Sequence, residues 1–153
     1  MSGQGAPKLH IDASGLAVTI VVTSWHEEIT NGLLAGAERA LKAAGNDVYT
    51  VMHVPGAFEL PLAAQYAIED GAEVVIALGV VIRGGTPHFE YVCNAATDGL
   101  TRVMLDSGIP VGFGLLTVDN EKQALDRAGL PGSKEDKGAE AVEAAILMAR
   151  LKA

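Results

Sequence analysis

A histidine follows a glycine-rich turn near the middle of the chain. Residues 73–82 are almost entirely apolar, Arg83 ends that run, and residues 84–88 read Gly-Gly-Thr-Pro-His before a helical pattern begins. The first N–H groups of a helix have no partners within it, so a strand that enters a helix through a glycine turn can bind an anion there. The imidazole of His88 adds a group that can move protons near neutral pH. Together these features predict chemistry on a phosphorylated substrate, although two glycines or one histidine alone would be a weak signal.

Aromatic and acidic side chains follow two other expected strands. Trp25, the only tryptophan, follows residues 16–23 after a single serine, and there it can either enter the core or offer a planar stacking surface. Phe58 and Glu59 come after residues 47–54. Glu59 can stabilise the first turn of a helix through its charge, or it can bind substrate hydroxyls. Both alternatives stay open for Trp25 and for Glu59.

Several other charged residues have ordinary structural interpretations. Arg127 ends a short expected helix, where a cation is favoured in any case. Lys137 likewise has no neighbour in the sequence that places it near a phosphate, and Arg83 can pair with a carboxylate at the sheet edge. The remaining histidines are interpreted as residues that bind no ligand: His10, His26 and His53.

These residues need a fold that brings strand ends together. Strands are expected at residues 16–23, 47–54, 73–82 and 111–117, and helices at residues 25–44, 57–70, 87–107, 121–127 and 136–152. The expected helix caps are Ser24 with Glu27, Thr86, and Asn120 with Gln123. Strict alternation of strand and helix predicts right-handed crossovers and a parallel sheet covered on both faces, with ligands bound at the carboxyl ends of the strands. We predict a flexible tail over residues 1–14 and one α/β domain over residues 15–153, a flavodoxin-like three-layer sandwich with a four-stranded, mainly parallel sheet.

The composition limits the partners of the chain. Its 11 Lys and Arg against 19 Asp and Glu give a formal net charge of −8, and without a basic cluster it offers no electrostatic footprint for nucleic acid or an anionic membrane. Cys93 is the only cysteine, and no Cys or His residues have zinc-binding spacing. No apolar run approaches the roughly 18 residues of a membrane span, and the tail lacks the apolar segment of a signal peptide. We expect a cytoplasmic protein with no metal, cofactor, nucleic-acid or membrane partner.

Motifs spread in order over nearly the whole chain after residue 14 resemble one known family. They are Trp25 after the first strand, residues 55–61 (PGAFELP), 79–92 (GVVIRGGTPHFEYV), 99–100 (GL), 110–117 (PVGFGLLT), 123–129 (QALDRAG) and 136–138 (DKG). Together they resemble 6,7-dimethyl-8-ribityllumazine synthase, which makes the penultimate intermediate of riboflavin biosynthesis. The resemblance implies condensation of 5-amino-6-(D-ribitylamino)uracil with 3,4-dihydroxy-2-butanone 4-phosphate, releasing phosphate and water.

The resemblance also implies roles for individual residues, with His88 as the proton carrier. The implied binding residues for the ribitylaminouracil are Trp25, Ala57, Phe58, Glu59, Val80, Val81, Ile82 and Phe113. The implied binding residues for the butanone phosphate are Gly85, Thr86, Arg127 and Lys137. Phe113 and Arg127 would reach in from a neighbouring subunit. Relatives often carry a side chain where this chain has Gly85, which implies at most a looser loop because the backbone N–H does the binding.

Shared sites imply a homo-oligomer, and the resemblance implies pentamers that in some relatives assemble further into icosahedral shells, with a functional link to riboflavin synthase. The turn at residues 129–136 is longer than in shell-forming relatives, so we expect a free pentamer.

Other functions are compatible with the fold. An electron carrier would be yellow as purified, and a receiver module would need an acidic pair after the first strand, which residues 23–25 lack. A non-catalytic member that binds flavin or builds a shell is the remaining alternative, against which Glu59, Thr86, His88 and Arg127 argue.

Overall fold

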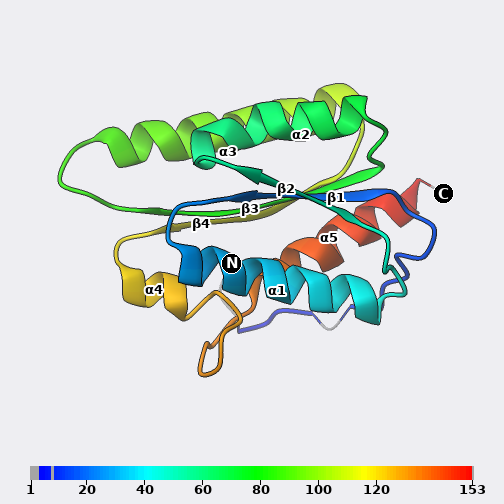
Figure 1. Cartoon of the computed structure of the whole chain (residues 1–153), viewed down its shortest axis with the longest axis horizontal. Coiled ribbons are helices and arrows are strands. Elements are labelled where there is room, and N and C mark those ends of the chain that lie inside the picture. Colours follow the sequence, from blue (N-terminus) through cyan, green and yellow to red (C-terminus); the bar gives the residue numbers. More distant parts are fainter. Residues whose placement is uncertain (1–3, 8, 153) are drawn as a thin grey trace.

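Parallel strands form a single sheet in the computed structural model, which describes residues 4–7 and 9–152. The order across the four-stranded sheet is β2-β1-β3-β4 (Figure 1). In that order the strands span Thr50–Val54, Val18–Thr23, Val74–Ile82 and Val111–Val118. All residues of β1 are buried, and β3 is buried over most of its length. Strands of this kind need cover on both faces, and the predicted parallel sheet is confirmed.

Helices supply that cover on both faces (Figure 1). On one face lie α2 (Leu60–Glu69), which a 3-10 turn at Ala57–Glu59 precedes, and α3 (His88–Ser107). On the other face lie α1 (Glu27–Ala43), α4 (Glu121–Leu125) and α5 (Lys137–Leu151). The arrangement is the predicted three-layer α/β sandwich, and it forms one domain.

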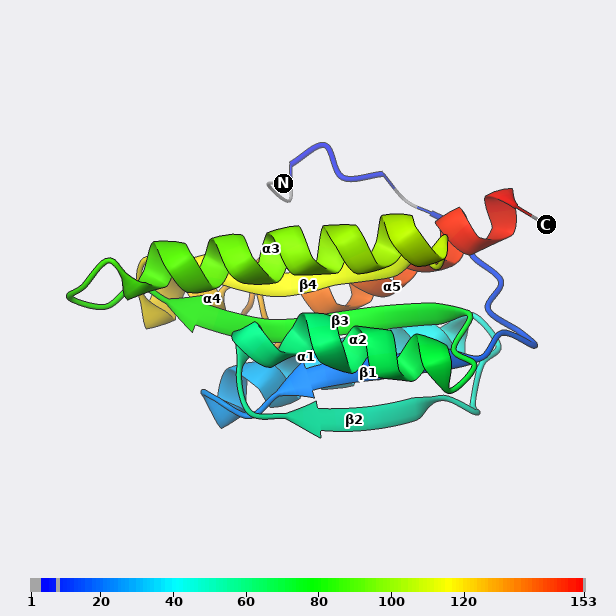
Figure 2. The ribbon, with the colours of Figure 1, turned by 90° about the horizontal axis from the view of Figure 1, so that it is seen from above.

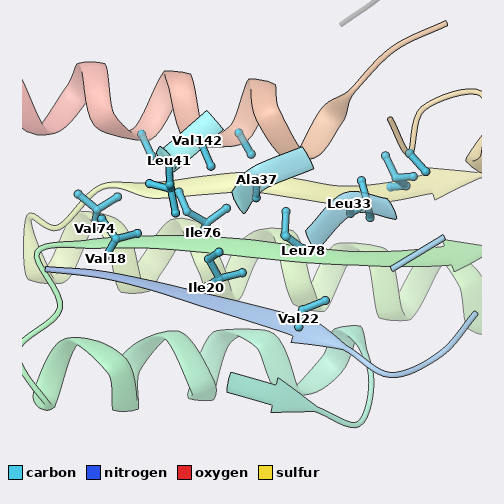
Figure 3. Packing of buried hydrophobic residues seen from close by; sticks show 14 of the residues in the cluster. Val18, Ile20, Val22, Leu33, Ala37, Leu41, Val74, Ile76, Leu78 and Val142 are labelled. Carbon is cyan, nitrogen blue, oxygen red and sulfur yellow. The ribbon is translucent and has the colours of Figure 1, made fainter. Parts of the chain in front are cut away.

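Each face of the sheet has its own apolar core. Figure 3 shows Ile20, Ile76 and Leu78 of the sheet packed with Leu33 and Val142 from α1 and α5. The second core lies between the sheet and the other two long helices and includes Val21, Val75, Ala77, Leu60 and Leu100. Successive residues of β1 and β3 therefore enter opposite cores, as the two-residue period of a strand requires. The sheet is thus held between two layers, and its strand ends have a fixed place.

Close contact between α1 and α5 depends on a glycine and a cap. A Cβ atom added to Gly138 would lie 2.0 Å from the backbone oxygen of Leu33. Asp136 caps α5 by accepting a hydrogen bond from the N–H of Ala139 at 3.0 Å. Its other carboxylate oxygen pairs with Arg39 of α1 at 3.1 Å. The start of α5 is therefore fixed against α1.

The predicted cap at the start of α1 is wrong. The helix begins at Glu27, and its N-cap is His26 in the left-handed conformation, with φ 55°. The Ser24 hydroxyl instead donates to the carbonyl oxygen of Val54 at 2.9 Å. Ser24 thereby ties the end of β1 to the end of β2.

The second strand is shorter than predicted, and its neighbour explains why. Thr50 pairs with Thr19, the second residue of β1, so residues 47–49 have almost no partner strand.

The predicted capping pair at the start of α4 is confirmed, because the N–H of Gln123 donates to the side-chain oxygen of Asn120 at 3.0 Å. The side chain of Gln123 accepts from the N–H of Asp119 at 2.7 Å.

Residues 12–14 contact the domain. Ala13 is fully buried, and its N–H donates to the carbonyl oxygen of Ala44 at 2.9 Å. The guanidinium of Arg150 donates to the carbonyl oxygens of Asp12 and Ser14, both at 2.8 Å. The division into a flexible tail over residues 1–14 and a domain over residues 15–153 stays a prediction, and residues 1–3, 8 and 153 lie outside the described part of the chain.

Candidate active site

A cavity of about 640 Å³ lies at the rim where the strands end. Figure 2 shows the strand arrowheads pointing to one side of the molecule, with the β3–α3 connection projecting beyond them. The lining residues are Trp25, His26, Gly56, Ala57, Phe58, Glu59, Val80, Val81, Ile82, His88, Tyr91 and Val92. They come from the segments after β1 and β2, from the end of β3 and from the first turn of α3 and the residue after it. The parallel topology is therefore what assembles this cavity.

Trp25 and Phe58 give the cavity two aromatic walls. Each of these side chains is 67% exposed, so Trp25 does not enter the core. A Cβ atom at Gly56 would lie 3.4 Å from the indole nitrogen of Trp25, at ordinary contact distance, so the ring packs directly beside this turn. Exposed aromatic rings beside a hollow are typical of a site that binds a ligand.

Glu59 adds a carboxylate to this apolar lining. One of its oxygens accepts the backbone N–H of Gly56 at 3.0 Å, and the N–H of Glu59 donates back to the carbonyl oxygen of Gly56 at 3.1 Å. Both bonds fix the 3-10 turn that follows β2. An exposed carboxylate held in this way can still accept hydrogen bonds from ligand hydroxyls.

The end of β3 forms an apolar wall. Val80, Val81 and Ile82 pair with successive residues of β4, ending at Ile82 with Val118. The N–H of Arg83 extends this pairing to the carbonyl oxygen of Val118 at 2.8 Å. The backbone of this wall is therefore held on the β4 side up to the point where the glycine turn begins.

The glycine turn is open, and His88 stands at its end. No heavy atom lies within 4 Å of a Cβ atom placed on Gly84 or Gly85. α3 begins at His88, one residue later than predicted, and Pro87 is its N-cap. Thr86 is therefore not the cap residue, although its hydroxyl lies 3.5 Å from the N–H of His88. The imidazole of His88 lines the cavity, while Gly85 and Thr86 adjoin it along the chain without lining it.

The structure does not bring Phe113, Arg127 and Lys137 into this cavity. They line a second hollow of about 550 Å³ along β4, between α3 and α5. β4 is the edge strand of the sheet on that side. Within one chain, the predicted site residues therefore fall into two separate groups.

A carboxylate links the two cations of the second hollow. Glu135, whose side chain is only 10% exposed, pairs with Arg127 at 3.4 Å and with Lys137 at 3.1 Å. Arg127 also donates to the carbonyl oxygen of Gln123 at 2.9 Å, and Lys137 pairs with Glu140 at 3.1 Å. Burial alone would lower the pKa of Lys137, but its bonds to Glu135 and Glu140 outweigh burial and raise it. Both cations are thus held in place by their partners, and Lys137 stays charged.

Two features are absent from the part of the chain that the structure describes, a metal-binding cluster and a membrane-spanning helix. No cluster of three or more His, Cys, Asp or Glu side chains there could hold a metal ion. No helix among those residues has the length and apolar character needed to cross a bilayer.

Comparison with known proteins identifies the family. A sequence model described as 6,7-dimethyl-8-ribityllumazine synthase matches residues 15–153. The chain belongs to this family. A protein of that name from Leifsonia xyli is 65% identical over 151 residues, covering 97% of this chain and 95% of the relative. Its namesakes from Clavibacter sepedonicus and Streptomyces avermitilis are 63% and 55% identical, over 99% and 97% of this chain and 96% and 93% of those relatives.

The lumazine synthase match covers both groups of predicted site residues, since Trp25 and Lys137 both fall within residues 15–153. The cavity also contains Tyr91 and Val92, for which the sequence predicted no role, and His26, which it placed near the rim but as a residue that binds no ligand. His26 follows Trp25 directly, and that proximity is the one signal that could have placed it here. Tyr91 and Val92 follow from helical spacing after His88, because residues three and four apart share a helix face.

Proposed function

We propose that the chain condenses 5-amino-6-(D-ribitylamino)uracil with 3,4-dihydroxy-2-butanone 4-phosphate to 6,7-dimethyl-8-ribityllumazine, releasing phosphate and water. This is the penultimate step of riboflavin biosynthesis. The observation that carries the proposal is the cavity itself. Two aromatic rings, a carboxylate and a histidine surround a hollow beside an open glycine turn, in a chain that is 65% identical to a protein named for this activity.

The uracil would lie between the aromatic walls and the end of β3. Trp25 offers a stacking face, Ala57 and Phe58 flank it, and Glu59 is suited to ribityl hydroxyls. The wall of Val80, Val81 and Ile82 would meet the edge of the pyrimidine through its backbone and apolar side chains. A planar, polyhydroxylated molecule fits this mixture of apolar surface and few polar groups.

The phosphate would bind at the glycine turn, to Gly85 and Thr86 near the start of α3. Condensation needs an amine and a ketone held together while protons move, so orientation supplies much of the rate. His88 stands between the turn and the cavity and is suited to carry those protons. No residue of the site has to change its oxidation state.

Phe113, Arg127 and Lys137 would complete the site of a neighbouring copy. Their separation from His88 within one chain and their place along the edge strand β4 both support a homo-oligomer with sites between subunits. We infer a pentamer. Residues 129–136 form a defined turn, closed by a bridge between Ala128 and Asp136. This turn sets how α5 leaves α4, and its length favours a free pentamer over an icosahedral shell.

We also infer a cytoplasmic enzyme whose product passes to riboflavin synthase.

Sedimentation at micromolar concentration tests the oligomeric state. Five chains of 15.8 kDa are expected, and a particle in the megadalton range would contradict the free pentamer.

The decisive experiment mixes both substrates with the purified protein and follows the fluorescence of the lumazine together with the release of phosphate. Stoichiometric appearance of both products supports the proposal. Flavin binding or shell assembly without turnover would instead support the non-catalytic alternative.

A further inference from the structure

Arg83 joins three segments that meet at the rim of the cavity. Its Nε donates to a carboxylate oxygen of Asp119, after β4, at 3.0 Å. Its Nη1 donates to a carboxylate oxygen of Glu90, in the first turn of α3, at 2.5 Å. The guanidinium also lies over the ring of Phe89, 4.4 Å from the ring centroid. From its place just after β3, one planar side chain thus contacts the β4–α4 connection and the start of α3.

These contacts hold the two ends of the 84–87 loop. Arg83 precedes the loop, while Phe89 and Glu90 come just after it. Gly84 and Gly85 have nothing within 4 Å of a Cβ position, so their conformation is not set by packing. A short open loop of this kind takes its shape largely from its anchors. In the proposed function the same loop contains the phosphate-binding residues Gly85 and Thr86, and His88 follows it directly.

Arg83 is not placed to bind an anion itself, because its side chain is already engaged. Two carboxylates occupy its guanidinium, and together they outweigh its single positive charge. Their hydrogen bonds, first that of Asp119 and then that of Glu90, raise the pKa of Arg83, so it stays charged. A phosphate approaching this guanidinium would meet the negative charge of Asp119 and Glu90 as well.

The same network extends toward Arg127. The N–H of Asp119 donates to the side chain of Gln123 at 2.7 Å, and Arg127 donates to the carbonyl oxygen of Gln123 at 2.9 Å. α4 and Arg127 are therefore connected to the loop through Arg83. If Arg127 serves a neighbouring copy, this connection runs from one site of the oligomer to the next.

We propose that Arg83 is a positioning residue that clamps the 84–87 loop and, through it, sets the affinity for the phosphorylated substrate. This inference rests on the proposed function. It means that Gly85 and Thr86, the proposed phosphate-binding residues, are held in place by Arg83, which does not itself line the cavity. An arginine is required because its planar fork bonds two carboxylates at once while stacking on a ring.

The first test compares Arg83→Gln with Arg102→Gln. Arg102 makes an exposed ion pair with Asp106 at 3.4 Å near the far end of α3, so the control removes the same charge at a place away from the loop. For Arg83→Gln we expect the KM for the butanone phosphate to rise at least roughly fivefold. We expect kcat to fall by less than about threefold and the KM for the uracil substrate to stay unchanged. Arg102→Gln should match the wild type in all three.

Amide hydrogen exchange tests the clamp without turnover. The informative amides flank the loop: the N–H of Arg83 donates to the carbonyl oxygen of Val118 at 2.8 Å, and the N–H of Glu90 donates to that of Pro87 at 3.1 Å. Arg83→Gln should speed exchange at these two amides but not in the middle of β3, and Arg83→Lys should give an intermediate rate. Unchanged exchange at both amides in Arg83→Gln, or the wild-type rate in Arg83→Lys, would overturn the proposal. If the wild type made no lumazine, the proposed function would fail, while the exchange result would still decide the role of Arg83.

The combined substitution Glu90→Gln and Asp119→Asn separates clamping from direct binding. A clamp predicts weaker inhibition by inorganic phosphate, in the same direction as Arg83→Gln, because the two ion pairs that anchor the loop are lost. A direct phosphate ligand predicts tighter inhibition, because the competing carboxylates are gone. The second outcome would refute the inference.

Discussion

His88 lies both at the start of a helix and at the wall of the cavity. It is the first residue of α3, next to an open glycine turn, and its exposed imidazole lines the cavity. A proton leaving or entering a substrate there can reach the imidazole without a rearrangement of the helix.

His88→Ala should therefore slow the reaction without abolishing it. A positioned acid or base contributes on the order of 10²–10⁴-fold, while orientation of the two substrates survives the substitution. Single-turnover fluorescence measures the effect on the chemical step. His53→Ala is the matched control, since His53 is an exposed residue of β2 outside the cavity lining. An unchanged rate in His88→Ala would show that another group moves the protons.

The sequence indicated the residues that follow strands but not all of their surroundings. Trp25, Phe58, Glu59 and His88 could be placed near one another because parallel strands end at the same rim. The left-handed backbone of His26 could not be predicted, because histidine adopts this conformation only occasionally, as asparagine and aspartate do, and no local signal marks this one for it. The pairing of Arg127 with Glu135 also depends on the path of the 129–136 turn, which periodicity does not describe.

At the scale of elements, the contact between α1 and α5 depends on Gly138. Gly138→Ala would place a Cβ atom 2.0 Å from the Leu33 oxygen, so the helices would have to separate. We expect a loss of about 1–3 kcal/mol of stability from overpacking, against a gain of up to about 1 kcal/mol from the better helix former. Chemical denaturation at a fixed protein concentration measures the change.

Gly84→Ala is the matched control for Gly138→Ala. Its Cβ atom would have nothing within 4 Å, so stability should stay within about 0.5 kcal/mol of the wild type. Equal stability of the two variants would mean that the α1–α5 contact tolerates an added methyl group.

Tyr49 and Glu38 tie the segment before β2 to α1, because the phenol donates to the carboxylate. Burial, followed by this hydrogen bond and the charge of Glu38, raises the pKa of Tyr49 to about 12 from its usual 10.0. A folded-state pKa above the unfolded value adds stability that is fully present below pH 10 and is lost as the pH rises toward 12.

Tyr49→Phe should accordingly lower stability by a constant amount below pH 10, and the difference from the wild type should vanish between pH 10 and pH 12. Ultraviolet absorbance of tyrosinate checks the assignment, because the variant should lack the titration step near pH 12. Retention of that step would assign it to another tyrosine.

Element order and type followed from hydrophobic patterning, whereas element ends did not. Buried strands such as β3 and capped helices such as α4 carry strong local signals. The start of β2 depends on where β1 begins, and the start of α1 depends on the bond from Ser24 to Val54. Both are contacts between segments distant in the sequence, which local patterning does not contain.

At the scale of the whole molecule, a site shared between copies predicts complementation. His88→Ala and Arg127→Gln chains, denatured together in equal amounts and reassembled, should form some contacts in which one copy supplies His88 and its neighbour supplies Arg127. Random assembly of a ring gives about one such contact in four, and so about one quarter of wild-type activity. The assay uses a butanone phosphate concentration far below the KM of the Arg127 variant, and each variant reassembled alone is the control.

If the mixed assembly recovered no more activity than those controls, His88 and Arg127 would not act together across two copies. They would then belong to the site of the same copy, or they would not share a site. Recovery would also show that the oligomer is part of the enzyme, because neither variant chain holds a complete set of site residues.

The single indole of the chain is Trp25, two-thirds exposed on the cavity wall. All tryptophan emission from the protein therefore originates at the place where the uracil is proposed to stack. Quenching of that emission can report ligand occupancy in the unmodified protein, one substrate at a time, before any product has formed.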